Sequence, residues 1–114
     1  MSNDQKEGCL VVGEGVLTAG QFQVPDIAFI SGQVNGDLTA REVVIGIKGV
    51  VRGNLIADVV DVRGEVQQNL IVNKSLFIRS TGKVLGNVTY TELEIEKGGD
   101  IQGSLIRAED KPGI

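Results

Sequence analysis

Several residue types on which protein chemistry depends are absent from this chain or nearly so. Its 114 residues include no His, no Trp, one Cys and two Pro, and only 4% are aromatic. His is the commonest general base and metal ligand. A single Cys excludes an intramolecular disulfide, a zinc–thiolate cluster and a CxxC redox pair. We therefore assign no catalytic, cofactor-binding or metal residue, and we predict that the protein is not an enzyme.

The charge and the hydropathy of the chain argue against several further classes of protein. The formal net charge is −4 and the pI is about 4.7, without the basic stripe that nucleic-acid binders carry. No apolar run reaches the roughly 18 residues of a membrane-spanning helix, and the first eight residues lack the apolar core of a signal peptide. These features predict a soluble, cytoplasmic protein with no nucleic-acid partner.

What the chain does contain is a repeat. Gly-x-apolar segments begin at Gly32, Gly49, Gly64, Gly82 and Gly99, and a degenerate earlier copy runs from Thr18 to Val24. Within a copy the apolar residues alternate, as in Leu38 and Ala40. The next apolar residue comes three positions later, at Val43, and the alternation then resumes. Alternation is the period of a β-strand, and the skip is typical of a corner.

Stacked copies of this kind predict a parallel β-solenoid with one coil per repeat. We expect an all-β, single-domain β-helix of about six coils of 15–18 residues with a triangular aliphatic core. The domain should span residues 10–108, between a flexible tail at 1–9 and a short tail at 109–114. In the first coil we assign the inward positions to Phe22, Val24, Ile27 and Phe29.

Two further columns would lie side by side in such a stack. The corner column is Gly in five coils and Gln68 in the other, which indicates a bend that needs a positive φ angle and a local difference at Gln68. The next column is Asp37, Asn54, Asn69, Asn87 and Ser104. These side chains could form a hydrogen-bonded ladder along the stack, or Asn could occur there only because it tolerates turns.

The repeats resemble those of the bactofilins, polymer-forming cytoskeletal proteins of bacteria. The resemblance covers roughly residues 10–108 and is strongest in the segments 32–45 and 82–96, with residues 10–15 similar to the family's start of the first coil. It implies a right-handed β-helix that assembles without nucleotide into filaments. It also implies roles in cell shape, polarity or envelope synthesis, with proteins of those processes as partners and a location that includes the inner membrane surface. The family tends to place an aromatic residue in its last coil, where Ile101 is the nearest counterpart.

The two ends of the solenoid are the candidate polymer interfaces. Terminal coils of a solenoid expose unpaired backbone groups and an apolar cross-section unless a cap covers them. The alternative is that the short tails fold over the ends as lids. The candidate residues are Val16, Leu17, Phe22 and Phe29 at the N-terminal end and Ile101, Leu105 and Ile106 at the C-terminal end.

An outward column supplies a second candidate surface. Ile56, Ile71 and Ile106 would form an apolar strip that could contact a neighbouring filament or a membrane surface. The plainer interpretation is that Ile suits any strand face. A weak cation site at Glu92, Glu94 and Glu96 lacks further ligands of suitable geometry.

Two other classes of short β-solenoid protein come into question, and one of them remains as an alternative. Short β-solenoid acyltransferases and carbonic anhydrase relatives use His and a strict six-residue repeat, and this chain has neither. A septum-site regulator of the MinC type also contains a short β-helix, and it would act here as a monomeric or dimeric binding module.

Overall fold

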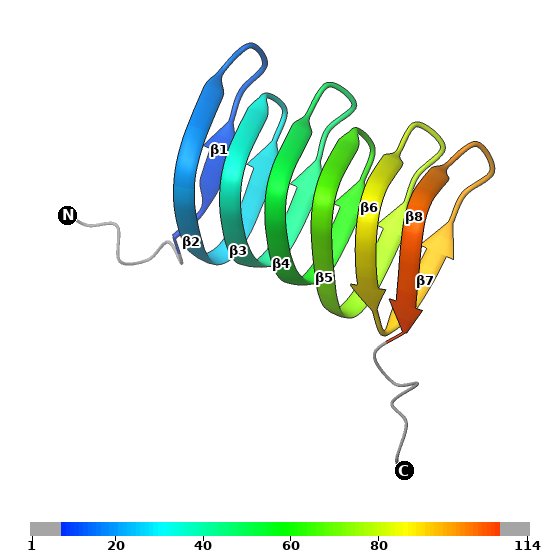
Figure 1. Ribbon diagram of the computed structural model, residues 1–114. Helices are drawn as coiled ribbons and strands as arrows, with labels where there is room; N and C mark the ends of the chain where they lie inside the picture. Colours follow the sequence, from blue (N-terminus) through cyan, green and yellow to red (C-terminus); the bar gives the residue numbers. More distant parts are fainter. Residues whose placement is uncertain (1–7, 108–114) are drawn as a thin grey trace.

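A computed structural model describes residues 8–107, and these residues form one continuous parallel β-solenoid (Figure 1). Each strand pairs in parallel with the strand one repeat further along the chain, in the order β1-β2-β3-β4-β5-β6-β8, while β7 pairs with β5. The strands are β1 (Leu10–Val12), β2 (Leu17–Ile30), β3 (Gln33–Ile45), β4 (Val50–Val62), β5 (Glu65–Ile78), β6 (Lys83–Tyr90), β7 (Glu92–Ile95) and β8 (Asp100–Arg107). The predicted fold class is confirmed.

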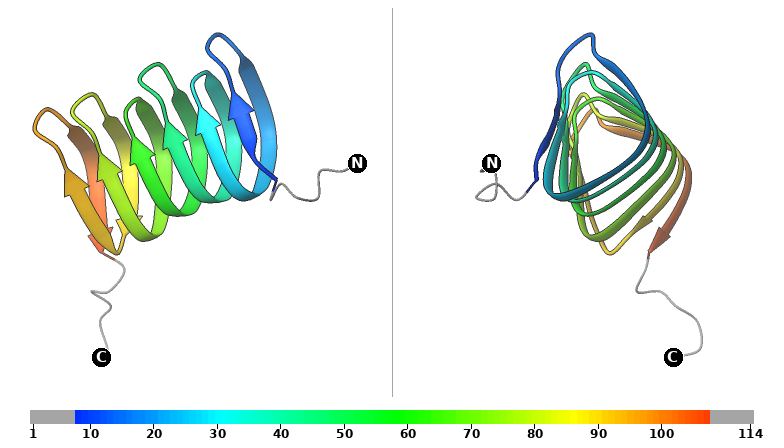
Figure 2. Two further views of the ribbon diagram at one scale, coloured as in Figure 1. Left: turned by 180° about the vertical axis from the view of Figure 1, so that it is seen from behind. Right: turned by 90° about the vertical axis from the view of Figure 1, so that its left-hand side faces the viewer.

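The views along and across the axis show the shape of each coil. Seen from the N-terminal end, the chain follows a triangular path (Figure 2). In Figure 1, β6 and β8 run downward on the near side and β1 and β7 run upward on the far side, while the coils advance from left to right. This winding is right-handed, as the resemblance implied.

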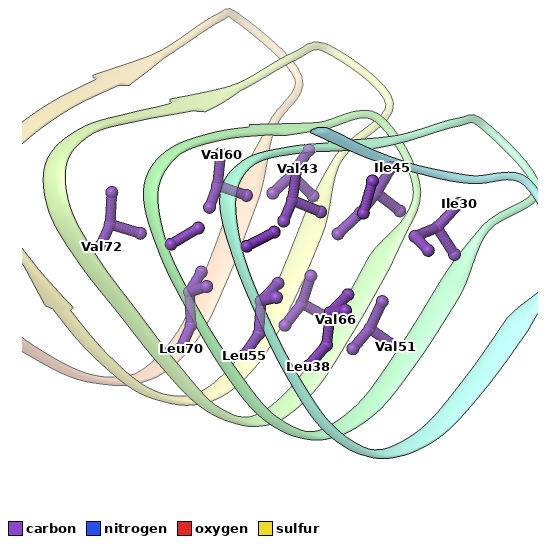
Figure 3. Packing of buried hydrophobic residues seen from close by; sticks show 14 of the residues in the cluster. Ile30, Leu38, Val43, Ile45, Val51, Leu55, Val60, Val66, Leu70 and Val72 are labelled. Atoms are coloured by element: carbon purple, nitrogen blue, oxygen red, sulfur yellow. The ribbon is translucent and has the colours of Figure 1, made fainter. Parts of the chain in front are cut away.

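The interior of the solenoid is a stack of aliphatic side chains. Val34, Val51, Val66 and Val84 form one inward column, and each is at most 1% exposed. Leu38, Leu55 and Leu70 form the next column, and Figure 3 shows these leucines, with Val51 and Val66, pointing into the core. No polar side chain is buried within residues 8–107. The core is therefore held together by apolar burial between like residues of successive coils.

The glycine corner is confirmed in its backbone conformation. Gly36 and Gly53 have φ angles of 127° and 129°. A Cβ atom at Gly53 would lie 2.0 Å from the carbonyl oxygen of Gly36 in the preceding coil. Gln68 occupies the same corner with a φ of 87°, so its coil accommodates a side chain by changing the backbone angle.

One part of the predicted alignment is wrong. In β2, the inward residues after the corner at Pro25–Asp26 are Ala28 and Ile30. Ile27 and Phe29, which were predicted to point inward, pair instead with the outward residues Glu42 and Val44. The cause is one extra residue at the Pro25–Asp26 corner, where the register between β2 and β3 shifts. This insertion moves each following side chain to the opposite face.

Besides the glycine corner and the corner at Pro25–Asp26, each coil has a third corner, where a loop connects it to the next coil. Its length differs between coils, since residues 46–49 connect β3 to β4 and residues 63–64 connect β4 to β5. These loops project at the top of Figure 1. Coils of different length can therefore stack, because this corner takes up a difference of two residues.

Candidate functional site: two terminal coils and one side of the solenoid

The N-terminal end of the described chain is an open coil edge. β1 pairs with β2 only through Ala28, Phe29 and Ile30, so the segment from Leu17 to Val24 has no strand on its outer side within residues 8–107. Phe22 lies against the core and is half-buried, whereas Leu17 is 72% exposed. The edge therefore combines free backbone groups with apolar side chains.

Three of the four residues predicted for this end lie on that edge. Phe22 occupies an inward column, and Val16 and the outward-facing Leu17 lie at the rim of the coil. Phe29 lies elsewhere, because it points outward on the side of the solenoid and pairs with Val11 of β1. Its side chain is 42% exposed on the side of the solenoid and does not lie at the end.

The C-terminal end of the described chain is an open edge of the same kind. β7 and β8 each pair with one strand, and no described residue covers their outer sides. Leu105 continues the inward column of Leu38 and Leu55, yet it is 46% exposed. Ile101 packs against the core and is half-buried, whereas Ile106 points outward. The predicted residues therefore lie in the last coil, with Ile106 at its rim.

Sequence reasoning missed two exposed apolar residues near the ends. Val11 is exposed in β1, and Ile95 is exposed at the end of β7 although it continues the inward column of Ile78. A signal for Val11 was present, because Leu10-Val11-Val12 has the same apolar pattern as the three residues with which it pairs. Ile95 is exposed because no further coil stacks on it.

Of the two interpretations of the Asn column, the hydrogen-bonded ladder is present from Asp37 to Asn87. The Asn54 amide donates to Asp37 over 2.9 Å, Asn69 donates to Asn54 over 2.8 Å, and Asn87 donates to Asn69 over 3.2 Å. Gln21 adds a longer bond of 3.5 Å to Asp37 at the N-terminal end. Each bond joins two coils, so the ladder fixes the register between them in addition to the backbone bonds.

The column beside the ladder contains the predicted apolar strip. Ile56 and Ile71 are neighbours, and Thr89 separates them from Ile106. The ladder and this column line a groove of about 390 Å³ on the outside of the solenoid. The strip is therefore continuous over two coils rather than three.

Another side of the solenoid carries an ion-pair cluster. The Arg79 guanidinium donates to Asp61 over 3.0 Å and to Glu96 over 3.1 Å, and it lies above the ring of Phe77. Hydrogen bonds to Asp61 and then to Glu96 raise the pKa of Arg79. Glu96 is thus engaged with an arginine, and no group of three or more potential ligand residues within residues 8–107 is placed to hold a metal ion.

Comparison with known proteins gives a consistent result. A model of the bactofilin family, described as polymer-forming cytoskeletal, matches residues 10–106. Bactofilin BacP of Myxococcus xanthus (strain DK1622) is 26% identical over 104 residues, which are 90% of this chain and 43% of BacP. Bactofilin BacO of the same organism is 21% identical over 96 residues, which are 83% of this chain and 76% of BacO. No solved structure matches the chain.

The described residues form a short β-solenoid whose two terminal coils are open edges. The family match extends over nearly all of the described residues. The chain therefore belongs to the bactofilin family of polymer-forming cytoskeletal proteins, which are not enzymes. The match favours this class over a septum-site regulator of the MinC type. None of the described residues forms a helix long and apolar enough to cross a membrane.

Proposed function

We propose that this protein assembles end to end into filaments through its terminal coils and that assembly needs no nucleotide. The observation that carries the proposal is the exposure of Leu105 in a column whose members in the four inner coils, Leu38, Leu55, Leu70 and Val88, are all buried. A further coil stacked on Leu105 would bury it as Leu55 is buried. The second coil can come only from another molecule or from residues outside 8–107.

The energetics of such a junction follow from its composition. Burial of apolar surface contributes about 25 cal/mol per Å², and the end also offers backbone N–H and C=O groups that a second edge can satisfy. Contacts between like ends, N-terminal with N-terminal and C-terminal with C-terminal, are one arrangement that the exposed edges allow. A filament of this kind needs no energy source, since the free edges are permanent features of the fold.

Cellular roles follow from the family rather than from the site. We propose that the filaments act as a scaffold for cell shape, polarity or envelope synthesis, with proteins of those processes as partners. The proposed location is the cytoplasm, including the periphery of the inner membrane.

The test compares Leu105→Arg and Leu17→Arg with Ile47→Arg. Ile47 is 68% exposed in the loop between β3 and β4, so it controls for an added charge at an exposed apolar residue away from the ends. Negative-stain electron microscopy and sedimentation are done with and without nucleotide and magnesium.

We expect wild type and Ile47→Arg to form filaments under both conditions. Leu105→Arg and Leu17→Arg should give short oligomers or single protomers with unchanged circular dichroism. Normal filaments from both end variants would overturn the assignment of the ends. Uniform small wild-type particles at high concentration would overturn the filament proposal and leave a monomeric or dimeric binding module.

A further inference from the structure

One side of the solenoid differs from the other two in charge. We call it the amide face, and it comprises residues 37–40 and the residues paired with them in the other coils. Asp37 is the only charged residue in its two outward columns, whereas the other sides carry Arg52, Glu65 and Asp61, among others. The two columns are Gln21, Asp37, Asn54, Asn69, Asn87 and Ser104, and Gln23, Thr39, Ile56, Ile71, Thr89 and Ile106.

The polar groups of the amide face are already partly satisfied. Asp37 accepts hydrogen bonds from Gln21 and Asn54, so its carboxylate has donors on both sides. Each ladder amide uses one N–H in the ladder and keeps a second one for another acceptor. Beside the ladder, Ile71 is 38% exposed and lines the groove. Little desolvation of charge would therefore oppose the burial of this face.

We propose that the amide face packs against the amide face of a second copy of this chain in a neighbouring filament, with the two solenoid axes antiparallel. The inference rests on the proposed end-to-end assembly. A second copy fits because it has the same coil spacing of about 4.8 Å. A contact made at one coil is therefore repeated at the next without loss of register.

The antiparallel arrangement follows from the order of residues along the face. A two-fold axis parallel to the strands sets the third coil of one copy opposite the fourth coil of its neighbour. Ile56 then faces the partner's Ile71, and Thr39 faces the partner's Thr89. Asp37 faces the partner's Asn87, whose amide can donate to the carboxylate. A parallel arrangement would instead reverse the strand direction of the partner, and it would set the Asp37 column against the partner's Thr39 column.

The size of the face explains why filaments are required. Six coils at about 4.8 Å and four residues at about 3.3 Å give a face of roughly 24 by 13 Å, or about 300 Å² per protomer. A stable interface needs about 800 Å² from each partner. Two single protomers are therefore below the limit, whereas three or more protomers joined in a filament reach it through multivalency.

The experiment uses separately preformed filaments of Ile56→Lys, Ile71→Glu and Ile56→Glu, with Ile47→Lys as the matched control. Bundles are counted by electron microscopy of each sample and of pairwise mixtures, and circular dichroism confirms the fold. Wild type and Ile47→Lys should form bundles. Each of the three strip variants alone should form single filaments, because every protomer would bury an unpaired charge.

Mixtures decide the arrangement. Ile56→Lys mixed with Ile71→Glu should restore bundles, because Lys and Glu then face one another in the antiparallel contact. Ile56→Lys mixed with Ile56→Glu should not restore bundles, although this mixture also combines one added positive charge with one added negative charge. Restoration only in the second mixture would overturn the antiparallel arrangement, and bundles of every variant alone would overturn the amide face as the contact.

Two possible results with the wild-type protein distinguish the lateral contact from end-to-end assembly. Filaments that remain single overturn the lateral contact and leave end-to-end assembly intact. Absence of filaments overturns both. Filaments that remain single in solution and coat phosphatidylcholine–phosphatidylglycerol vesicles through Ile71 would assign the face to lipid instead of to a second copy.

Discussion

The inner coils and the terminal coil of this solenoid differ in burial, although they have the same residue types at equivalent positions. Leu55 and Leu105 occupy the same inward column, but the first is fully buried and the second is 46% exposed. Their coils have the same corner glycine, at Gly53 and Gly103, with φ angles of 129° and 133°. The difference is the presence of a following coil.

This comparison shows that burial in a solenoid is determined by the neighbouring coil and not by the residue's own strand. A globular domain closes its core upon itself, whereas a stack of coils can be extended at any plane. A junction between two protomers can therefore resemble the interior of one protomer. For this reason the end coils can serve as interfaces without any specialised motif in the sequence.

The largest expected effect comes from shortening the buried leucine. Leu55→Ala should destabilise the fold by about 3 kcal/mol, because it leaves a cavity between two coils. Leu105→Ala should cost less than about 1 kcal/mol in the isolated protomer, because its side chain is only partly buried. Urea unfolding followed by circular dichroism measures both, at concentrations where sedimentation shows single protomers. Equal costs would contradict the difference between middle and end.

The glycine corner allows a second comparison. Gly53→Ala should cost about 2 kcal/mol, because its Cβ would lie 2.0 Å from a backbone oxygen and its φ angle is positive. Gly20→Ala has the same backbone strain with no atom within 4 Å of the added Cβ, so we expect about 1 kcal/mol. The same unfolding measurement tests this, and a larger cost at Gly20 would contradict it.

Much of the fold was predictable because a repeat tests each assignment several times. The inward columns, the glycine corner and the amide ladder each recur in successive coils, so one pattern supported another. The first coil was predicted less well because Pro25 and Asp26 add a residue in a copy that is itself degenerate. A single insertion is visible only where the neighbouring copies give a firm register.

The candidate site was predictable only in outline. Which residues belong to the terminal coils followed from the order of the repeats, whereas the sideways position of Phe29 depended on the register of one corner. The exposed Ile95 was missed because its pattern is the same as that of the buried Ile78. The Arg79 cluster joins three coils through long side chains, and spacing alone does not indicate which carboxylates an arginine reaches.

A third prediction uses Gln68, which replaces glycine in the glycine corner of one coil. Gln68→Gly should stabilise the protein by about 1 kcal/mol, because a non-glycine residue at a φ of 87° is strained and glycine is not. A rise of several degrees in the melting temperature is the expected readout. Gln67→Gly, one residue earlier in the same strand, is the control and should be destabilising. A fall in stability of Gln68→Gly would show that the glutamine side chain makes a compensating contact.

The smallest expected effect concerns the ladder and again compares the middle with the end. Asn69 makes two ladder bonds, one to Asn54 and one from Asn87, whereas Gln21 at the first coil makes one long bond. Asn69→Ala should therefore cost about 0.5–1 kcal/mol, since each bond competes with water at the surface, and Gln21→Ala should cost almost nothing. Hydrogen exchange of the amides in β4 and β5 should also speed up in Asn69→Ala, because the ladder helps to hold these coils in register. If both variants unfold at the same urea concentration as wild type, the ladder contributes to the shape of the amide face and not to the stability of the stack.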